Sequence, residues 1–366
     1  MVDSIHLARW LQQFTEEPID FLLFSSGPNR QVHQSIRRLL EEGNLATFKL
    51  FYRSSVISLA VWLIDFGLRS SSLRGLILRR AITKFKPHYL HALEFQQAGY
   101  VALAACNKMS IRHFEIIVTN YGSDIYFFQN KAHHLQKIRA LLQMADRYAS
   151  ECNRDVDLAL RFGFNGRVMP VYPNGGGFSL AHLSREMREF HDRYVLVVKG
   201  YHGWSGRALV ALAALSRIRK QLESYTVVVI QSDAVVRVVG FFMRRFLGLN
   251  ISCHKKGALP RDSVLNLYDH AVVYVGLSVT DGISTSMLEA MSGGAIPVQT
   301  ASACCDEWFF DTGVRVSQLN ATSVSMAILN AIEIAKSHPN LLRNRETISR
   351  KASEGDVRKA ALEFYR

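Results

Sequence analysis

Short apolar runs alternate along the chain with longer stretches in which apolar residues recur at helical spacing. The runs are rich in β-branched residues and continuously apolar, which predicts strands buried on both faces of a parallel sheet. They are Ile19–Ser26, Glu115–Asn120, Tyr194–Gly200, Tyr225–Ser232, His270–Ser278 and Ala295–Thr300. Helical patterns such as QVHQSIRRLLEEG and RALVALAALSRIRKQL follow the first and third runs. This alternation predicts doubly wound α/β architecture, in which ligands bind beyond the carboxyl ends of the strands.

The length of the chain favours two such domains. Its 366 residues exceed what one ordinary hydrophobic core accommodates. A glycine-rich stretch, YPNGGGFSLAHL (Tyr172–Leu183), marks the neighbourhood of the predicted junction. A flexible loop is the simpler interpretation of these glycines, and a ligand-binding role for the backbone of Gly175–Gly177 is the alternative.

The stretch TDGISTSMLEAM, which follows a predicted strand, combines a strand end, a glycine turn and a helix start. Ser284 or Thr285 is placed to cap the helix, and the N–H groups of its first turn would attract a phosphate. Gly282 would let a ligand approach the backbone closely. Asp281 and Glu289 would accept hydrogen bonds from hydroxyls, and polyol with phosphate is the chemistry of a nucleotide sugar. In the alternative interpretation, Asp281 supports the turn and Glu289 faces solvent.

The longer segment SVTDGISTSMLEAMSGGAIPVQT resembles the donor-site signature of family-4-type retaining glycosyltransferases. That signature consists of a glutamate, seven residues, a second glutamate, Ala-Met and a Gly-x-Pro-Val turn. Glu289 takes the second glutamate position and Asp281 takes the first, with a side chain one methylene shorter. The resemblance implies that Glu289 holds the ribose, and that Asp281 holds the sugar together with the backbone of Gly282, Ile283 and Ser284.

The same resemblance implies the GT-B fold, in which two Rossmann-like doubly wound domains face each other across a cleft. Residues 1–188 are then the acceptor-binding domain and residues 189–345 the donor-binding domain. Residues 346–366 form a C-terminal helix that packs back on the first domain. The loop after the first predicted strand, SSGPNR, has one glycine, Gly27, where the family has several. Gly27 is predicted to let the backbone approach the donor phosphates.

A second glycine-rich loop, VVKGYHGWSGRAL, leaves a predicted strand at Lys199 and enters a helix at Arg207. Lysine supplies a point charge and arginine a bidentate fork, a pair suited to a diphosphate. A basic surface loop is the alternative, but the glycines between the two cations have no evident packing purpose. In the resembling family an arginine and a lysine in this region hold the leaving diphosphate. Lys199 and Arg207 occupy matching places with the residue types exchanged.

The N-terminal half carries a looser resemblance. PHYLHALEFQQAGY and VTNYGSDIYFF resemble the family's acceptor-side segments, in which a histidine follows one strand and a Gly-Ser-Asp turn follows the next. The resemblance makes His91 a catalytic candidate and places Glu94, Gly122, Ser123 and Asp124 along the same cleft. Taken alone, a single histidine is more often a core or surface residue.

The charge balance narrows the class of partner. Lys+Arg number 44 against 31 Asp+Glu, a formal net charge of +13, which favours a phosphorylated ligand, a membrane surface or nucleic acid. The dispersed basic residues argue against a nucleic-acid-binding module. The segment Phe51–Lys86 mixes cations with apolar residues and predicts a surface for an anionic membrane. A packed helix pair with a solvated basic face is the alternative.

Signals for membrane insertion or secretion are weak. The best apolar run, Ser55–Leu68, is interrupted by Asp65 and is shorter than the ~20 residues that a membrane span needs. The N-terminus lacks a basic patch and an apolar signal core. The five cysteines have no metal-site or disulfide spacing. We therefore expect a reduced, cytoplasmic protein, peripheral on the inner face of the cytoplasmic membrane where the basic segment binds it.

Together these patterns predict a retaining glycosyltransferase of surface polysaccharide biosynthesis. It would move a sugar from a nucleotide-diphosphate sugar to a saccharide or lipid-linked saccharide. Cations and N–H dipoles around the leaving diphosphate would carry catalysis, so that neither a metal nor another cofactor is expected. The alternatives are a nucleotide-sugar epimerase or a sugar phosphorylase of the same fold and, more remotely, a non-enzymatic nucleic-acid-binding protein.

Overall fold

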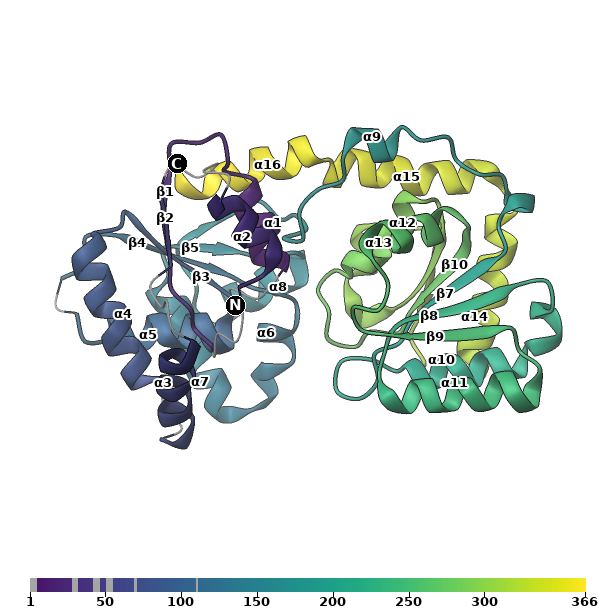
Figure 1. Ribbon diagram of the computed structural model, residues 1–366, viewed down its shortest axis with the longest axis horizontal. Helices are drawn as coiled ribbons and strands as arrows, with labels where there is room; N and C mark the ends of the chain where they lie inside the picture. The colour runs from purple at the N-terminus through teal and green to yellow at the C-terminus, as the bar shows by residue number, and fades with distance from the viewer. Residues whose placement is uncertain (1–4, 28–31, 42–46, 51–54, 69–70, 110) are drawn as a thin grey trace. The chain divides into compact units, whose positions relative to one another are not determined.

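The computed structural model describes residues 5–27, 32–41, 47–50, 55–68, 71–109 and 111–366. Contacts divide the chain into two compact units (Figure 1). The N-terminal unit consists of Met1–Gly177 and Gly355–Arg366, and the C-terminal unit of Phe178–Glu354. The first change of unit lies inside the glycine-rich stretch, earlier than the expected boundary after residue 188. Phe178 forms a β-bridge with Ser353, which joins the two ends of the C-terminal unit.

The C-terminal unit contains a six-stranded parallel sheet in the order β12-β11-β10-β7-β8-β9. Its strands are β7 (Val195–Lys199), β8 (Thr226–Ser232), β9 (Ile251–Lys255), β10 (Ala271–Gly276), β11 (Ile296–Thr300) and β12 (Val314–Val316). This is the doubly wound Rossmann order, which reverses between the first strand of the unit, β7, and the fourth, β10. The carboxyl ends of β7 and β10 therefore form the switch point at which such sheets bind ligands.

Helices cover both faces of this sheet, and apolar side chains of strands and helices form one core between them. In Figure 1, α10 and α11 lie side by side on one face and α12 and α13 pack together on the other. The helices are α9 (Leu180–Leu183), α10 (Ala208–Arg217), α11 (Ala234–Leu247), α12 (Arg261–Asp269), α13 (Thr285–Ser292), α14 (Ala321–Ala335) and α15 (His338–Ala352). Short 3₁₀ turns are η3 (Phe190–Asp192), η4 (Arg219–Leu222), η5 (Ala301–Ala303) and η6 (Cys305–Glu307).

The N-terminal unit contains two parallel sheets in its described residues. The larger has the order β3-β4-β5-β6, with β3 (Tyr89–Leu93), β4 (Glu115–Thr119), β5 (Arg147–Ala149) and β6 (Arg167–Val168). The smaller pairs β1 (Asp20–Leu23) with β2 (Thr47–Leu50). The strand predicted first in the chain is thus present, but it pairs outside the main sheet.

Helices of the N-terminal unit include the C-terminal segment of the chain. They are α1 (Ile5–Gln12), α2 (Gln34–Glu41), α3 (Ser55–Gly67), α4 (Ser72–Phe85), the π-helix η1 (Phe95–Gly99), α5 (Tyr100–Cys106), α6 (Ser123–Tyr126), η2 (Phe128–Asn130), α7 (Ala132–Met144), α8 (Asn153–Arg161), α16 (Glu354–Leu362) and η7 (Glu363–Tyr365). Arg147 on β5 donates to the carbonyl oxygens of Phe364 (3.0 Å) and Arg366 (2.6 Å), which holds the C-terminus against the sheet. Within the described ranges, no helix combines the length and the apolar character needed to cross a membrane.

Candidate functional site

Two loops predicted separately from the sequence form one site at the switch point of the C-terminal sheet. The loop after β7 and the loop after β10 are hydrogen-bonded to each other along their main chains. Arg207 N–H donates to the Leu277 carbonyl (2.9 Å), and Val279 N–H donates to that of Ser205 (3.0 Å). The Ser278 hydroxyl also donates to the Ser205 carbonyl (3.1 Å). The structure therefore brings Lys199 and Arg207 to the turn that carries Asp281.

Two glycines of the loop after β7 have a clear packing purpose, contrary to the argument made from sequence. A Cβ on Gly200 would lie 2.5 Å from Cα of Ser232, and one on Gly206 would lie 2.5 Å from the Tyr201 carbonyl oxygen. Gly203 has a φ of +108°, which side chains rarely adopt. These glycines fold the loop back over β8 and allow Arg207 to stand at the start of α10.

The cation at the end of β7 is paired with the carboxylate of the second loop. Lys199 Nζ donates to Asp281 Oδ2 at 2.7 Å and to the Ser284 hydroxyl at 3.2 Å. Burial by itself lowers the pKa of Lys199, but the Asp281 carboxylate outweighs it, so that this pKa lies above its usual range. Lys199 is therefore a fixed positive charge at the switch point.

Helix α13 begins at this cation. Ser284 is the residue before the helix, as expected, and its carbonyl accepts the Met287 N–H (2.9 Å). Its hydroxyl caps no N–H group and instead lies near the hydroxyls of Ser286 (3.0 Å) and Tyr274 (3.3 Å). Tyr274 also contacts Ser286 (2.7 Å). Tyr274 has no sequence signal of its own, because it resembles the other buried residues of β10.

Glu289, in the second turn of α13, does not face solvent. Its side chain is 13% exposed and lies 3.9 Å from the guanidinium of Arg261, at the start of α12. Burial raises the pKa of Glu289, and the charge of Arg261 partly opposes this. The interpretation of Glu289 as a solvated surface residue is wrong. Arg261 had no sequence signal, since its role depends on the packing of α12 against α13.

The N-terminal unit brings its predicted carboxylates together at the carboxyl ends of β3 and β4. Asp124 Oδ2 accepts the N–H groups of Phe95 (3.1 Å) and Tyr121 (3.2 Å). Glu94 precedes Phe95, is buried, and has a positive φ of 86°. Burial raises the pKa of Glu94, and burial with the nearby Glu94 raises that of Asp124 well above its usual range. The main chain turns into α6 at Gly122, whose φ is 52°.

His91 lies inside β3 and not after it. Its Nδ1 contacts the Tyr365 hydroxyl (2.9 Å) and its Nε2 contacts the Thr119 hydroxyl (2.7 Å). Burial among aromatic rings, with Trp10 centred 5.3 Å away, lowers the pKa of His91 to about 3. Together with Tyr121 the imidazole lines a cavity of about 550 Å³ in this unit. His91 is thus a neutral hydrogen-bonding residue at physiological pH.

Two further sequence predictions fall in or near the first helices of the N-terminal unit. A Cβ on Gly27 would lie 4.0 Å from the amide oxygen of Gln97, so Gly27 lies beside the helix that follows Glu94. Arg74, one of the cations of the segment Phe51–Lys86 for which a membrane surface is predicted, is buried and pairs with Asp65 at 2.8 Å. Residues 51–54 and 69–70 of that segment lie outside the described residues.

An Asp-x-Asp sequence occurs at Asp155 and Asp157 in α8, the pattern that often marks a metal-dependent transferase. Asp155 is buried, pairs with Arg154 (2.7 Å) and accepts a hydrogen bond from Asn120 (2.8 Å). Asp157 is exposed, and residues two apart on a helix do not face each other. These two aspartates therefore do not form a metal-binding pair.

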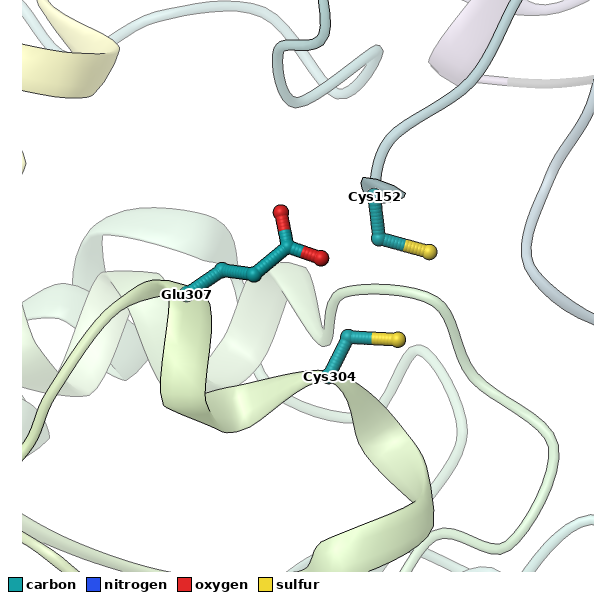
Figure 2. A group of neighbouring side chains, drawn as sticks. All are labelled: Cys152, Cys304 and Glu307. Atoms are coloured by element: carbon teal, nitrogen blue, oxygen red, sulfur yellow. The ribbon is translucent and has the colours of Figure 1, made fainter. Parts of the chain in front are cut away.

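All five cysteines lie among the described residues, and none of them forms a disulfide bond. Cys304 lies between η5 and η6, and its side chain and that of Glu307 project from the same side of these turns (Figure 2). Cys152, also drawn there, precedes α8 in the N-terminal unit. Burial raises the pKa of the neighbouring Cys305 to about 12, so this thiol stays protonated.

No protein-family profile and no curated protein sequence matches this chain. Solved structures do match. The HepE protein of Anabaena, in complex with UDP and glucose, matches with a TM-score of 0.70 and 13% sequence identity. The match covers 100% of this chain and 96% of the HepE chain. The lipopolysaccharide outer core galactosyltransferase WaaB matches with a TM-score of 0.68 and 13% identity, over 100% of this chain and 98% of the WaaB chain. Sucrose-phosphate synthase of Thermosynechococcus elongatus has a TM-score of 0.63 at 15% identity, covering 80% and 77%. The chain therefore has the GT-B fold of glycosyltransferases.

Proposed function

We propose that this chain is a glycosyltransferase that uses a nucleotide-diphosphate sugar bound to its C-terminal unit. The observation that carries the proposal is the Lys199 ammonium, held charged by Asp281 at the switch point of a Rossmann-ordered sheet and beside the start of α13. A fixed cation and helix N–H groups at that position suit a diphosphate. The likeness to HepE, solved in complex with UDP-glucose, supports the same choice of ligand.

In the proposed reaction the bond between the anomeric carbon and the diphosphate breaks, and a bond from that carbon to an acceptor hydroxyl oxygen forms. The electron pair of the broken bond stays on the diphosphate, which gains negative charge. Lys199 and the first turn of α13 stabilise this charge, because Asp281 and Ser284 orient Lys199 before the reaction begins. Arg207, whose guanidinium donates to the Gly203 and Gly206 carbonyls, adds a second positive charge from the same loop. The acceptor proton passes to the leaving phosphate oxygen on the same face, which retains the anomeric configuration. This scheme needs no metal ion.

The remaining residues position the donor. Glu289 accepts hydrogen bonds from the ribose, and its low exposure makes it a directional acceptor. Asp281 orients Lys199 through the 2.7 Å contact and, with the backbone of Gly282, Ile283 and Ser284, holds the sugar. Buried Tyr274 and half-buried Ser286 hold the Ser284 hydroxyl through hydrogen bonds.

For the acceptor we propose a saccharide or lipid-linked saccharide of surface polysaccharide assembly at the inner face of the cytoplasmic membrane. The supporting residues are Glu94, Asp124 and His91 of the N-terminal unit, which gather hydrogen-bonding groups. One cation, Arg154, donates to the Gly122 carbonyl beside them (3.1 Å). The main chain at Gly122 and Ser123 would contribute to the same surface. Neutral hydroxyl groups are the ligands that such a surface binds without an electrostatic penalty.

A donor-binding screen tests the proposal. Melting curves of the wild-type chain are recorded with UDP, GDP, ADP, CMP and their common sugar conjugates, each with and without EDTA. A ligand at about 100 times its dissociation constant stabilises the fold by about 2.7 kcal/mol. We expect one nucleotide to raise the melting temperature selectively, with EDTA making no difference.

The variants Lys199→Ala and Lys220→Ala complete the screen. Lys220 is an exposed cation in η4, far along the chain from the switch point, and its loss should leave the nucleotide effect unchanged. Loss of Lys199 should abolish it. If no nucleotide stabilises the wild-type chain, or if the Lys199 variant responds like the wild type, the donor site is assigned incorrectly.

A further inference from the structure

The outer face of α11 is the strongest unexplained feature of the C-terminal unit. Its exposed residues are largely apolar, although they belong to a helix of a well-packed domain. The exposed fractions are Val235 46%, Val238 55%, Phe241 64%, Phe242 52% and Phe246 69%. An exposed apolar stripe on a helix is normally covered by a partner, because a solvated helix keeps polar residues on its outer side.

We infer that this face of α11 docks on the surface of an anionic lipid bilayer. The inference does not rest on the proposed transfer reaction, since it concerns the side-chain chemistry of one helix and its neighbours.

The inner face of α11 accounts for how the helix is held. Val236, Gly240 and Met243 are buried against the sheet. A Cβ on Gly240 would lie 2.4 Å from Sγ of Cys253 on β9, so the glycine lets the helix approach that strand closely. The apolar residues of the outer face are therefore not needed for packing within the unit.

The outer face is a continuous stripe and not a scatter of single residues. Val235, Val238, Phe242 and Phe246 follow one another at spacings of three and four, which places them along one side of the helix. The rings of Phe242 and Phe246 stack with centroids 5.7 Å apart, and Phe241 meets Phe242 edge-on at 5.8 Å. Three phenylalanine rings thus form one apolar surface.

Cations border this stripe. Arg244 and Arg245 are exposed in the last turn of α11, and Arg245 lies over the Phe246 ring at 5.6 Å. The sequence of α11 contains no acidic residue. Further exposed cations lie at the end of the neighbouring α10, at the start of η4 and at the end of β9: Arg217, Arg219, Lys255 and Lys256. The combination complements a surface that is apolar inside and anionic outside.

These charges favour a bilayer over a second copy of the chain. A second copy of the same helix would offer these arginines no carboxylate, because α11 contains no acidic residue. In a bilayer, the phenylalanine rings would enter the boundary between headgroups and acyl chains, while the arginines would contact lipid phosphates. The helix has 14 residues and would lie in the plane of the surface, because a span needs about 20.

The membrane surface predicted from sequence for the segment Phe51–Lys86 lies in the other unit and stays a prediction. Helix α3, in the segment predicted from sequence, also exposes apolar residues such as Val56 and Phe66. The sequence of α3 contains no cation; in the next helix Arg74 is turned inward to Asp65, while Arg80 and Lys84 are exposed. On α11 the exposed apolar residues and the exposed cations belong to a single helix.

Vesicle flotation tests the inference with the full chain. Vesicles of phosphatidylcholine alone are compared with vesicles of equal parts phosphatidylcholine and phosphatidylglycerol, at low and at physiological salt. We expect binding to the anionic vesicles that weakens with salt. The double variants Phe242→Ser/Phe246→Ser and Arg244→Glu/Arg245→Glu should each weaken binding at least about tenfold. All the replaced side chains are exposed, so melting curves should show that both variants fold.

Matched controls are Phe310→Ser and Arg350→Glu, which remove an exposed ring and an exposed cation elsewhere in the C-terminal unit. Both should float like the wild type. The inference is overturned if the wild-type chain does not bind anionic vesicles, or if the α11 variants bind them as the wild type does. It is also overturned if sedimentation shows a dimer that the phenylalanine variant dissociates, since the face would then bind a second copy.

Discussion

The carboxyl ends of the two main parallel sheets differ in the charge state of their ionisable side chains. In the C-terminal unit, Lys199 and Asp281 form an ion pair at 2.7 Å, and the pair keeps the lysine charged in a partly buried site. In the N-terminal unit, Glu94 and Asp124 are buried near each other, and their pKa values are raised, which favours the neutral forms. The same topology thus presents a fixed cation at one edge and hydrogen-bonding carboxyl groups at the other. The first suits a diphosphate and the second suits hydroxyl groups.

Among the tests of this contrast, removal of the Lys199 cation should have the largest effect on activity. We expect Lys199→Ala to reduce kcat/KM for sugar transfer by about 10²–10³-fold, the range seen when one preoriented group that stabilises transition-state charge is removed. Initial rates with the nucleotide sugar identified by the binding screen provide the measurement. Lys220→Ala, as the matched control, should transfer sugar at the wild-type rate. A Lys199 variant within about threefold of wild type would mean that the leaving group is stabilised elsewhere.

The ion pair itself can be tested through its effect on protonation. Burial lowers the pKa of Lys199 and the Asp281 carboxylate raises it, so Asp281→Asn should lower that pKa. The transfer rate of the variant should therefore fall as the pH rises, at a pH where the wild-type rate is still constant. At neutral pH the loss should be smaller, about tenfold. The measurement is the pH–rate profile of both proteins, and superimposable profiles would contradict a charge role for Asp281.

Glu289 is expected to act on donor affinity more than on chemistry. Glu289→Gln keeps the size of the side chain and removes the charge that strengthens hydrogen bonds to ribose. We expect the donor KM to rise about tenfold with little change in kcat, since hydrogen bonds to charged groups contribute about 1.5–3 kcal/mol. Steady-state kinetics over a range of donor concentrations separate the two constants. A fall in kcat at unchanged KM would instead place Glu289 at the reacting atoms.

The donor side of the site could be predicted because its signals are local. A strand end, a glycine turn and a helix start follow one another within a few residues, and Asp281, Ser284 and Glu289 take their places from that succession. Contacts between distant segments could not be predicted in the same way. Arg261 reaches Glu289 only through the packing of α12, and Tyr274 reaches Ser286 from the interior of β10.

Polar residues in strands and paired charges in apolar segments caused the clearest differences from sequence expectation. The strand β9, ISCHK, is not predicted from the sequence, because polar residues interrupt its apolar pattern at the edge of the sheet. The family resemblance predicts that His91 follows a strand. The histidine instead lies inside β3, where hydroxyl groups satisfy both of its ring nitrogens. The sequence pattern alone is typical of a surface cation at Arg74, because its partner, Asp65, lies on another helix. A pattern read along the chain does not show such partners.

The smallest effect on sugar transfer is expected from Asp124, a buried carboxyl group at the carboxyl ends of β3 and β4. A carboxyl group whose pKa is raised in the folded state binds its proton more tightly there than in the unfolded chain. Its contribution to stability is therefore present at low pH and is lost as the pH rises from about 4, the ordinary carboxyl value, through the raised pKa. Asp124→Asn retains an oxygen to accept the N–H groups of Phe95 and Tyr121 and removes this titration.

We therefore expect the variant to gain stability relative to wild type as the pH rises above about 4, by about 1 kcal/mol or more for each unit by which the pKa was raised. Urea unfolding at a series of pH values measures the difference. Asp157→Asn, at an exposed position of α8, should give a constant difference at every pH. Parallel pH curves for Asp124→Asn and wild type would show that Asp124 is ionised in the folded protein. The two sheet edges would then differ in which charge they carry, and not in whether they carry one.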